Sequence, residues 1–249
     1  MAEQPNKSPV ALVVGAGDFI GAAIAKRFAA GGFATAVGRR NADKLAPLVA
    51  EIEASGGRAR GFALDAREET NVQAVFETIE RELGPLEVVV FNVGANVNFP
   101  ITETTSRVFR KVWEMACLGG FLTGREAARV MLPRQRGSVF FTGATASLRG
   151  GKGYAAFASA KFGLRALAQS MARELGPSNI HVAHLVIDAG VDTAWVRERI
   201  RGSGRDPAAL APDTLMNPSS IGEAYWMLHQ QPRDAWTHEL DLRPHAENW

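Results

Sequence analysis

Val10-Ala-Leu-Val-Val-Gly-Ala-Gly-Asp-Phe-Ile-Gly-Ala-Ala-Ile-Ala-Lys-Arg-Phe28 is the stretch that decides the fold. A short apolar run ends at Val14, a glycine-rich turn follows, and a helical pattern begins directly after the turn. Gly15 lets the chain turn sharply off the strand, Gly17 leaves room for a phosphate, and Gly21 lets the helix lie close to the sheet. The N–H groups that open this helix then face an anion. This order of strand, turn and helix predicts the opening of a dinucleotide-binding βαβ unit.

Short apolar runs alternate with helical patterns along most of the chain. The predicted strands are Ala11–Val14, Phe33–Val37, Arg58–Ala63, Leu86–Asn92, Ser138–Thr142 and His181–Ile187, with Ala235–Leu242 as an added edge strand. The predicted helices lie near 20–30, 41–55, 68–82, 104–131, 155–175 and 219–230. This alternation favours an α/β fold, with a doubly wound parallel sheet of the Rossmann type in three α/β/α layers. We expect one domain over 1–249, with the glycine- and proline-rich segment 188–218 as a substrate loop or lid.

Composition excludes several classes of function. The net charge is +2 and the 28 basic residues are scattered, so we expect no nucleic-acid partner. No apolar run is long enough to span a bilayer, and residues 1–9 lack the apolar core of an export signal. Cys117 is the single cysteine, which rules out an intrachain disulfide and a multi-cysteine metal site. We therefore expect no metal site, no membrane partner and a cytoplasmic location.

Several motifs in a fixed order indicate a known family. They are Gly15-Ala-Gly-Asp-Phe-Ile-Gly21, Leu64-Asp65, Phe91-Asn-Val-Gly94, Ala158-Ser-Ala-Lys161 with the helix that continues to Leu175, and Asn179-Ile-His-Val182. Over almost its whole length the chain resembles the classical short-chain dehydrogenase/reductases. The resemblance implies a single Rossmann-type domain, a nicotinamide cofactor, a small-molecule substrate and a homodimer or homotetramer.

The resemblance also implies roles for individual residues. Those matching the family's cofactor positions are Gly15, Gly17, Phe19, Ile20 and Gly21 at the phosphate turn, Asp65 at the adenine, Asn92 and Gly94 beside the adenosine, Lys161 at the ribose, and Thr193 at the carboxamide. Phe19 occupies the place of the family's central glycine, where its ring narrows the turn.

The end of the second strand indicates which cofactor is preferred. A carboxylate at this place would accept a hydrogen bond from the ribose 2′-hydroxyl and repel a 2′-phosphate. The sequence instead has Gly38-Arg39-Arg40, and a guanidinium pairs a phosphate through two N–H groups. We therefore expect NADP(H) in preference to NAD(H). The alternative is that both arginines are solvated loop charges.

The catalytic positions depart from the family pattern. Lys161 fills the lysine place, but Phe157 stands where the family has its tyrosine, four residues earlier. The serine place falls on Ala144, and the asparagine place on Ala116 or the adjoining Cys117. Because a phenylalanine ring has no proton to give, carbonyl reduction requires another group to supply one.

Three residues are candidates to replace the missing groups. Tyr154 precedes Lys161 by seven residues and shares its helix face if the helix extends that far; otherwise it is a loop aromatic at the mouth of the site. Thr145 offers a hydroxyl beside Ala144, although neighbours on a strand point to opposite faces. Asp188, at the carboxyl end of the sixth strand, is either a general base or a turn-forming surface residue.

Two functions remain open on these residues. The first is an NADP(H)-dependent oxidoreductase that transfers a hydride between nicotinamide and a small alcohol or carbonyl compound, with Lys161, Tyr154, Thr145 and Asp188 as its catalytic candidates. The second is a nucleotide-binding sensor or partner subunit of the same fold without dehydrogenase turnover. The retained cofactor residues fit both. The replaced catalytic residues favour the second, whereas the nearly standard helix around Lys161 favours the first, which we take as the main expectation.

Overall fold

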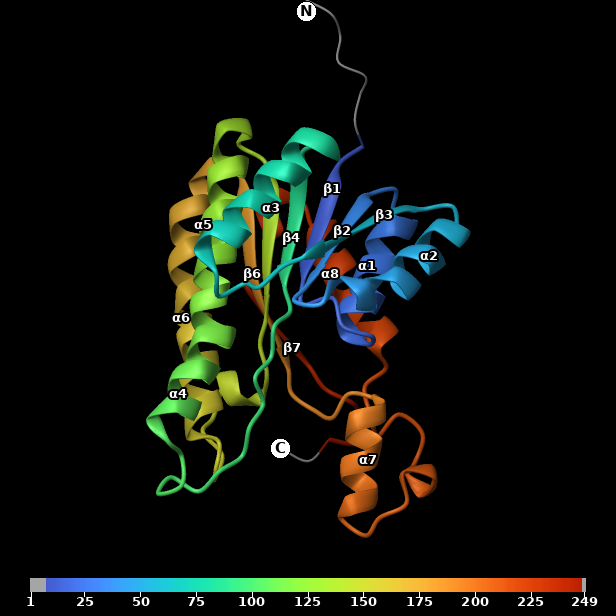
Figure 1. Cartoon of the computed structure of the whole chain (residues 1–249), viewed down its shortest axis with the longest axis vertical. Coiled ribbons are helices and arrows are strands. Elements are labelled where there is room, and N and C mark those ends of the chain that lie inside the picture. Colours follow the sequence, from blue (N-terminus) through green and yellow to red (C-terminus); the bar gives the residue numbers. More distant parts are fainter. Residues whose placement is uncertain (1–7, 248–249) are drawn as a thin grey trace, which may run out of the picture.

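One parallel sheet of seven strands, in the order β3-β2-β1-β4-β5-β6-β7, forms the centre of the molecule (Figure 1). The computed structural model describes residues 8–247. Residues 1–7 and 248–249 lie outside that range, so most of the segment 1–9, for which we expect no export signal, is not described. The strands are β1 (Val10–Val14), β2 (Ala34–Arg39), β3 (Arg58–Ala63), β4 (Leu86–Phe91), β5 (Gly137–Thr142), β6 (Ile180–Ile187) and β7 (Glu239–Leu242). The strand order reverses between β1 and β4, and ligands of such sheets bind outside the carboxyl ends at that point.

Helices cover both faces of the sheet. They are α1 (Ile20–Ala30), α2 (Ala46–Ala54), α3 (Glu69–Glu82), α4 (Ser106–Trp113), α5 (Gly119–Met131), α6 (Ala155–Leu175), α7 (Ala194–Gly202) and α8 (Pro218–His229). One apolar core joins α3, α5 and α6 to the sheet, and a second joins α1, α2 and α8 to the opposite face (Figure 1). The predicted three-layer, doubly wound α/β fold is confirmed. None of the helices between residues 8 and 247 is long and apolar enough to cross a bilayer.

The sequence pattern missed one break in a helix. The predicted helix near 104–131 is interrupted by η2, a π-helical turn over Glu114–Leu118 between α4 and α5. Sequence reasoning predicts a continuous helix here, because π-helical turns are rare and occur mostly as single turns inside α-helices. The turn contains Ala116 and Cys117, the residues at the family's asparagine place.

The glycines of the first turn differ in what surrounds them. A Cβ on Gly21 would lie 2.6 Å from the backbone oxygen of Gly15, so only glycine lets α1 start this close to β1. Gly15 has a φ of +86°, in the left-handed region that glycine favours. A Cβ on Gly17 would meet nothing within 4 Å. The space over Gly17 is therefore open, as a diphosphate site requires.

His184 makes the stability of the fold depend on pH. It lies fully buried on β6, and neither ring nitrogen has a hydrogen-bond partner within residues 8–247. Burial, followed by the nearby Lys161 charge, lowers the pKa of His184 to about 3. The unfolded chain binds this proton near pH 6.5, so the stabilisation is complete above pH 6.5 and is lost as the pH falls toward 3. Lowering the pH from 7 to 5 should cost about 2 kcal/mol of unfolding free energy from His184 alone, and His229, whose pKa burial lowers to about 4, should add to this loss.

Urea unfolding at pH 7 and pH 5 measures this loss. His184→Leu should reduce the loss of stability between pH 7 and pH 5, while His245→Gln, which removes an exposed histidine, should leave the loss as in the wild type. An equal slope in wild type and His184→Leu would show that His184 is not the source.

Candidate functional site

A cavity of about 560 Å³ opens at the carboxyl ends of β1, β2, β3 and β4. Seven of the predicted cofactor residues line it, namely Gly15, Gly17, Arg39, Arg40, Asp65, Asn92 and Gly94. Phe19 does not line this cavity; its side chain precedes α1 and is 37% exposed. The phosphate turn is thus open rather than blocked by the Phe19 ring.

Positive charge gathers on one side of this first cavity. Arg39 donates to Asp18 at 3.1 Å and to the backbone oxygen of Lys44 at 3.4 Å, while Arg40 is exposed. Lys44 and Arg67 also line the cavity, and sequence reasoning had missed both. Lys44 could have been identified from the sequence, because it follows Arg39 and Arg40 by only a few residues, on the first turn after β2.

Asp65 is held in a two-pronged ion pair. Arg67 donates from Nε to Oδ1 at 2.9 Å and from Nη2 to Oδ2 at 2.5 Å, and Asn71 accepts from the Asp65 backbone N–H at 2.8 Å. Hydrogen bonding to Arg67 holds the pKa of Asp65 below its usual value. Asp65 is therefore an ionised acceptor at the end of β3, on the side where the resemblance places the adenine.

Asn92 connects two strands at the floor of the cleft. Its backbone N–H donates to the Val14 oxygen at 2.8 Å, and its side-chain Nδ2 donates to the Gly15 oxygen at 3.1 Å. These contacts hold the phosphate turn against the end of β4. The residue is structural for the turn as well as a wall of the cavity.

A second cavity, of about 1060 Å³, lies beside the first at the ends of β4, β5 and β6. The two cavities share Asn92, Val93 and Gly94, so they meet. The predicted residues that line this second cavity are Ile20, Thr145, Tyr154, Lys161 and Thr193. Residues from 189 to 215, including α7, form much of its wall.

Lys161 lies at the inner end of the second cavity and is almost fully buried. Its ammonium donates to the Thr142 oxygen at 2.7 Å and to the Val93 oxygen at 3.2 Å. Burial lowers the pKa of Lys161 to about 8. Its Nζ lies 5.9 Å from the centre of the Phe157 ring, which has no hydroxyl.

Tyr154 caps the start of α6 and is not within the helix. Its hydroxyl accepts a hydrogen bond of 3.0 Å from Nη2 of Arg199, on α7. Both side chains line the second cavity. Arg199 was not among the predicted residues, because 45 residues separate it from Tyr154.

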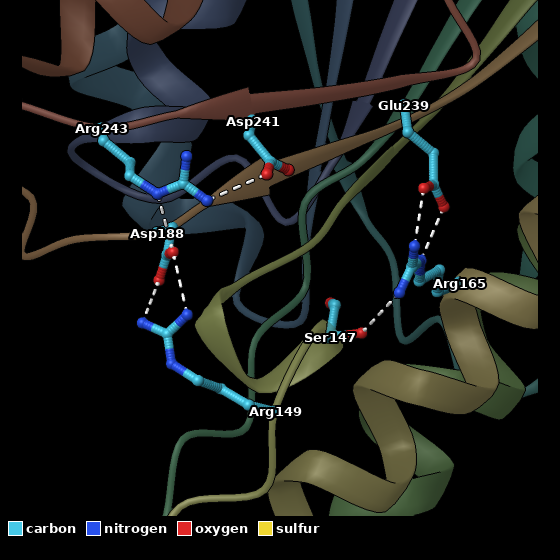
Figure 2. Close-up of polar contacts among 7 residues, drawn as sticks. All are labelled: Ser147, Arg149, Arg165, Asp188, Glu239, Asp241 and Arg243. Atoms are coloured by element: carbon cyan, nitrogen blue, oxygen red, sulfur yellow. Dashed lines mark hydrogen bonds and ion pairs between the residues drawn. The ribbon is translucent and has the colours of Figure 1, made fainter. Parts of the chain in front are cut away.

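Asp188 is buried and lines neither of these two cavities. Arg149 donates to it at 3.1 and 3.3 Å, and Nε of Arg243 donates at 2.9 Å (Figure 2). Burial alone would raise the pKa of Asp188, but hydrogen bonds from Thr145, Arg243 and Arg149 lower it overall. Thr145 thus lines the second cavity and also lowers the pKa of Asp188.

Three apolar residues that we predict at catalytic positions lie in the cavity wall or in the core next to it. Ala144 and Phe157 line the second cavity, and Ala116 is buried in the cluster that also contains Phe157. Across the part of the chain that the structure describes, no group of three or more His, Cys, Asp or Glu side chains is placed to hold a metal ion.

Comparison with known proteins agrees with this geometry. The family profile of the short chain dehydrogenases matches residues 9–202. The crystal structure of a short-chain dehydrogenase from Rhodopseudomonas palustris is 58% identical, with a TM-score of 0.82, over 95% of this chain and 99% of the other. The alcohol dehydrogenase from the archaeon Thermococcus sibiricus, complexed with 5-hydroxy-NADP, is 26% identical, with a TM-score of 0.82, over 96% of this chain and 98% of the other.

A curated relative has a named activity. The 2-dehydro-3-deoxy-D-gluconate 5-dehydrogenase of Formosa agariphila is 32% identical over 177 residues, which is 71% of this chain and 67% of that protein. Together with the profile match, the sheet order and the cleft at the strand ends, this shows that the chain belongs to the short-chain dehydrogenase family of oxidoreductases.

Proposed function

We propose that the protein is an NADP(H)-dependent oxidoreductase that transfers a hydride between nicotinamide and a small alcohol or carbonyl compound. The observation that carries this proposal is the meeting of the two cavities at Asn92, Val93 and Gly94. Basic side chains line the first cavity, and Lys161 lines the second. Together the two cavities suit a dinucleotide and its substrate.

The residues present fit such a cofactor. The open space over Gly17 and the N–H groups that open α1 suit a diphosphate. Arg39, Arg40 and Lys44 would hold a 2′-phosphate, and Asp65 would accept from the adenine amino group. Lys161 and Thr193 would hold the nicotinamide half. The bound cofactor would supply or take up the hydride.

We assign the role of proton donor to Tyr154. Its hydroxyl oxygen accepts from Arg199, so the phenol proton remains free to be donated toward the cavity. The guanidinium charge then faces the phenolate that proton transfer leaves behind. Tyr154 would take the role of the family's tyrosine, and Arg199 would supply from α7 the cation beside the phenol, while Lys161 keeps its place at the cofactor. The segment 188–218 would form the substrate loop, because it brings Arg199 to the cavity.

The second candidate, a nucleotide-binding protein without turnover, is favoured by Phe157, Ala144 and Ala116. NADPH oxidation, followed by absorbance with a panel of aldehydes and ketones, separates the two. Turnover on one or more carbonyl compounds supports the oxidoreductase. Saturable NADPH binding without turnover on any of them supports the second candidate.

Exposed apolar side chains favour a homodimer or homotetramer. Phe109, Trp113, Phe121 and Phe162, on α4, α5 and α6, are each 40–42% exposed. An apolar patch of this kind marks a protein contact, and the family resemblance indicates a second copy of this chain. Light scattering would give twice or four times 26.8 kDa if this is right.

We also propose a cytoplasmic location. The basis is the single cysteine, which excludes an intrachain disulfide.

A further inference from the structure

The loop between β5 and α6 forms one wall of the second cavity. It contributes Ala144, Thr145, Ala146 and Arg149 to that wall. Residues Thr145–Ser147 form the short 3-10 helix η4, closed by backbone bonds from Ser147, Leu148 and Arg149. A three-residue turn has little stability of its own, so contacts from outside the loop must fix its position.

The first outside contact runs from β7 through α6. Glu239, on β7, accepts two hydrogen bonds from Arg165 at 2.6 and 2.7 Å. Nη1 of the same arginine reaches the backbone oxygen of Ser147 at 3.5 Å (Figure 2). The Ser147 hydroxyl in turn accepts from the Ala144 N–H at 3.1 Å. Hydrogen bonding to Arg165 lowers the pKa of Glu239 to about 2, so this carboxylate stays ionised at neutral pH.

The second outside contact runs from the residue after β7 through Asp188. Nε of Arg243 donates to the Asp188 carboxylate, which Arg149 of the loop also contacts (Figure 2). Nη2 of Arg243 donates to Asp241 at 2.9 Å. Asp188 is 1% exposed, and a buried carboxylate is tolerated only with charged partners around it. Loss of Arg243 would leave Arg149 to compensate this charge from a half-exposed position.

Both contacts start within a few residues of each other at the C-terminal end of the chain. Glu239 reaches the middle of the loop and Arg243 reaches its far end, so the loop is held at two points. We propose that Glu239 and Arg243 are positioning residues, through which the last strand fixes the loop 144–149 as a wall of the substrate cavity. The link to substrate rests on the proposed function, whereas the link to the loop does not.

Amide hydrogen exchange of the protein without cofactor tests this inference independently of turnover. In Arg243→Gln, the amides of Ser147, Leu148 and Arg149 should exchange at least about tenfold faster than in the wild type. Amides of β3, on the far side of the sheet, should be unchanged. Arg243→Lys, which keeps a cation beside Asp188, should recover most of the protection.

Arg134→Gln is the matched control. Arg134 also makes a two-pronged pair with a carboxylate, Glu80, and donates to a backbone oxygen, that of Leu86, but at the other end of the sheet. It should leave the loop amides protected. Unchanged loop exchange in Arg243→Gln, or equal acceleration in the loop and in β3, would overturn the proposal.

Glu239→Gln tests the other contact and serves if Arg243→Gln does not fold. It should accelerate exchange of the same three amides, because a neutral amide holds Arg165 less strongly. Unchanged exchange of these amides would overturn the role of Glu239.

With a carbonyl substrate that is turned over, Arg243→Gln should lower kcat/KM at least about tenfold while NADPH affinity stays the same. Absent NADPH binding would refute the proposed function and leave the exchange result valid.

Discussion

Tyr154→Phe should lower kcat by a factor of about 10²–10⁴, because general acid–base assistance contributes that much to a rate. Tyr154 has a phenol at the second cavity, and a guanidinium already donates to its oxygen. The substitution removes one oxygen and leaves the ring in place. NADPH affinity and thermal stability should stay close to those of the wild type.

Tyr225→Phe is a matched control, since the chain has two tyrosines. Tyr225 is fully buried on α8 and lines neither cavity, and its hydroxyl lies 2.6 Å from that of Thr142, a residue of the second cavity wall. Its loss should cost about 1 kcal/mol of stability without a comparable fall in kcat. If kcat of Tyr154→Phe stayed within a factor of two of the wild type, Tyr154 would not be the proton donor.

Arg39 and Arg40 should determine the preference for NADPH over NADH. A hydrogen bond between charged groups contributes about 1.5–3 kcal/mol, so replacing both arginines by alanine should weaken NADPH binding at least about tenfold, and up to a few hundredfold. NADH has no 2′-phosphate, and its affinity should change little. Fluorescence titration of both nucleotides measures the two dissociation constants.

Arg60→Gln is a control for loss of charge near the cofactor cavity. Arg60 lies on the neighbouring strand β3 and pairs with Glu82 at 2.6 Å, outside the first cavity. It should not change the ratio of the two dissociation constants. An equal loss of NADPH and NADH affinity in the double alanine variant would mean that the two arginines do not bind the 2′-phosphate.

Local sequence patterns predicted the sheet because each strand is marked by its own residues. Val10–Val14 is a continuous apolar run, and Leu86–Phe91 is apolar except for Glu87, as expected for strands buried on both faces. The glycine turn could be predicted equally well, since the backbone geometry of these few residues requires glycine at positions 15 and 21. These features predict a nucleotide site at the ends of the strands, where the first cavity lies.

Long-range side-chain pairs could not be predicted in the same way. Arg199 meets Tyr154 across 45 residues, and Arg243 meets Asp188 across 55. No periodicity marks an arginine for such a contact, and the sequence has many arginines that are solvated. Asp188 was noticed because it departs from the family pattern. Its burial between two guanidiniums became visible only in the structure.

Titration of NADPH into the wild type and into Gly17→Ala, followed by nicotinamide fluorescence, tests most directly whether a dinucleotide lies along the strand ends. A Cβ at position 17 meets no protein atom within 4 Å, so the variant should unfold at the same temperature as the wild type. Its methyl group would occupy the space of the diphosphate. We predict saturable binding to the wild type and at least about tenfold weaker binding to Gly17→Ala. No binding to the wild type, or equal affinity in both proteins, would contradict cofactor binding at this turn.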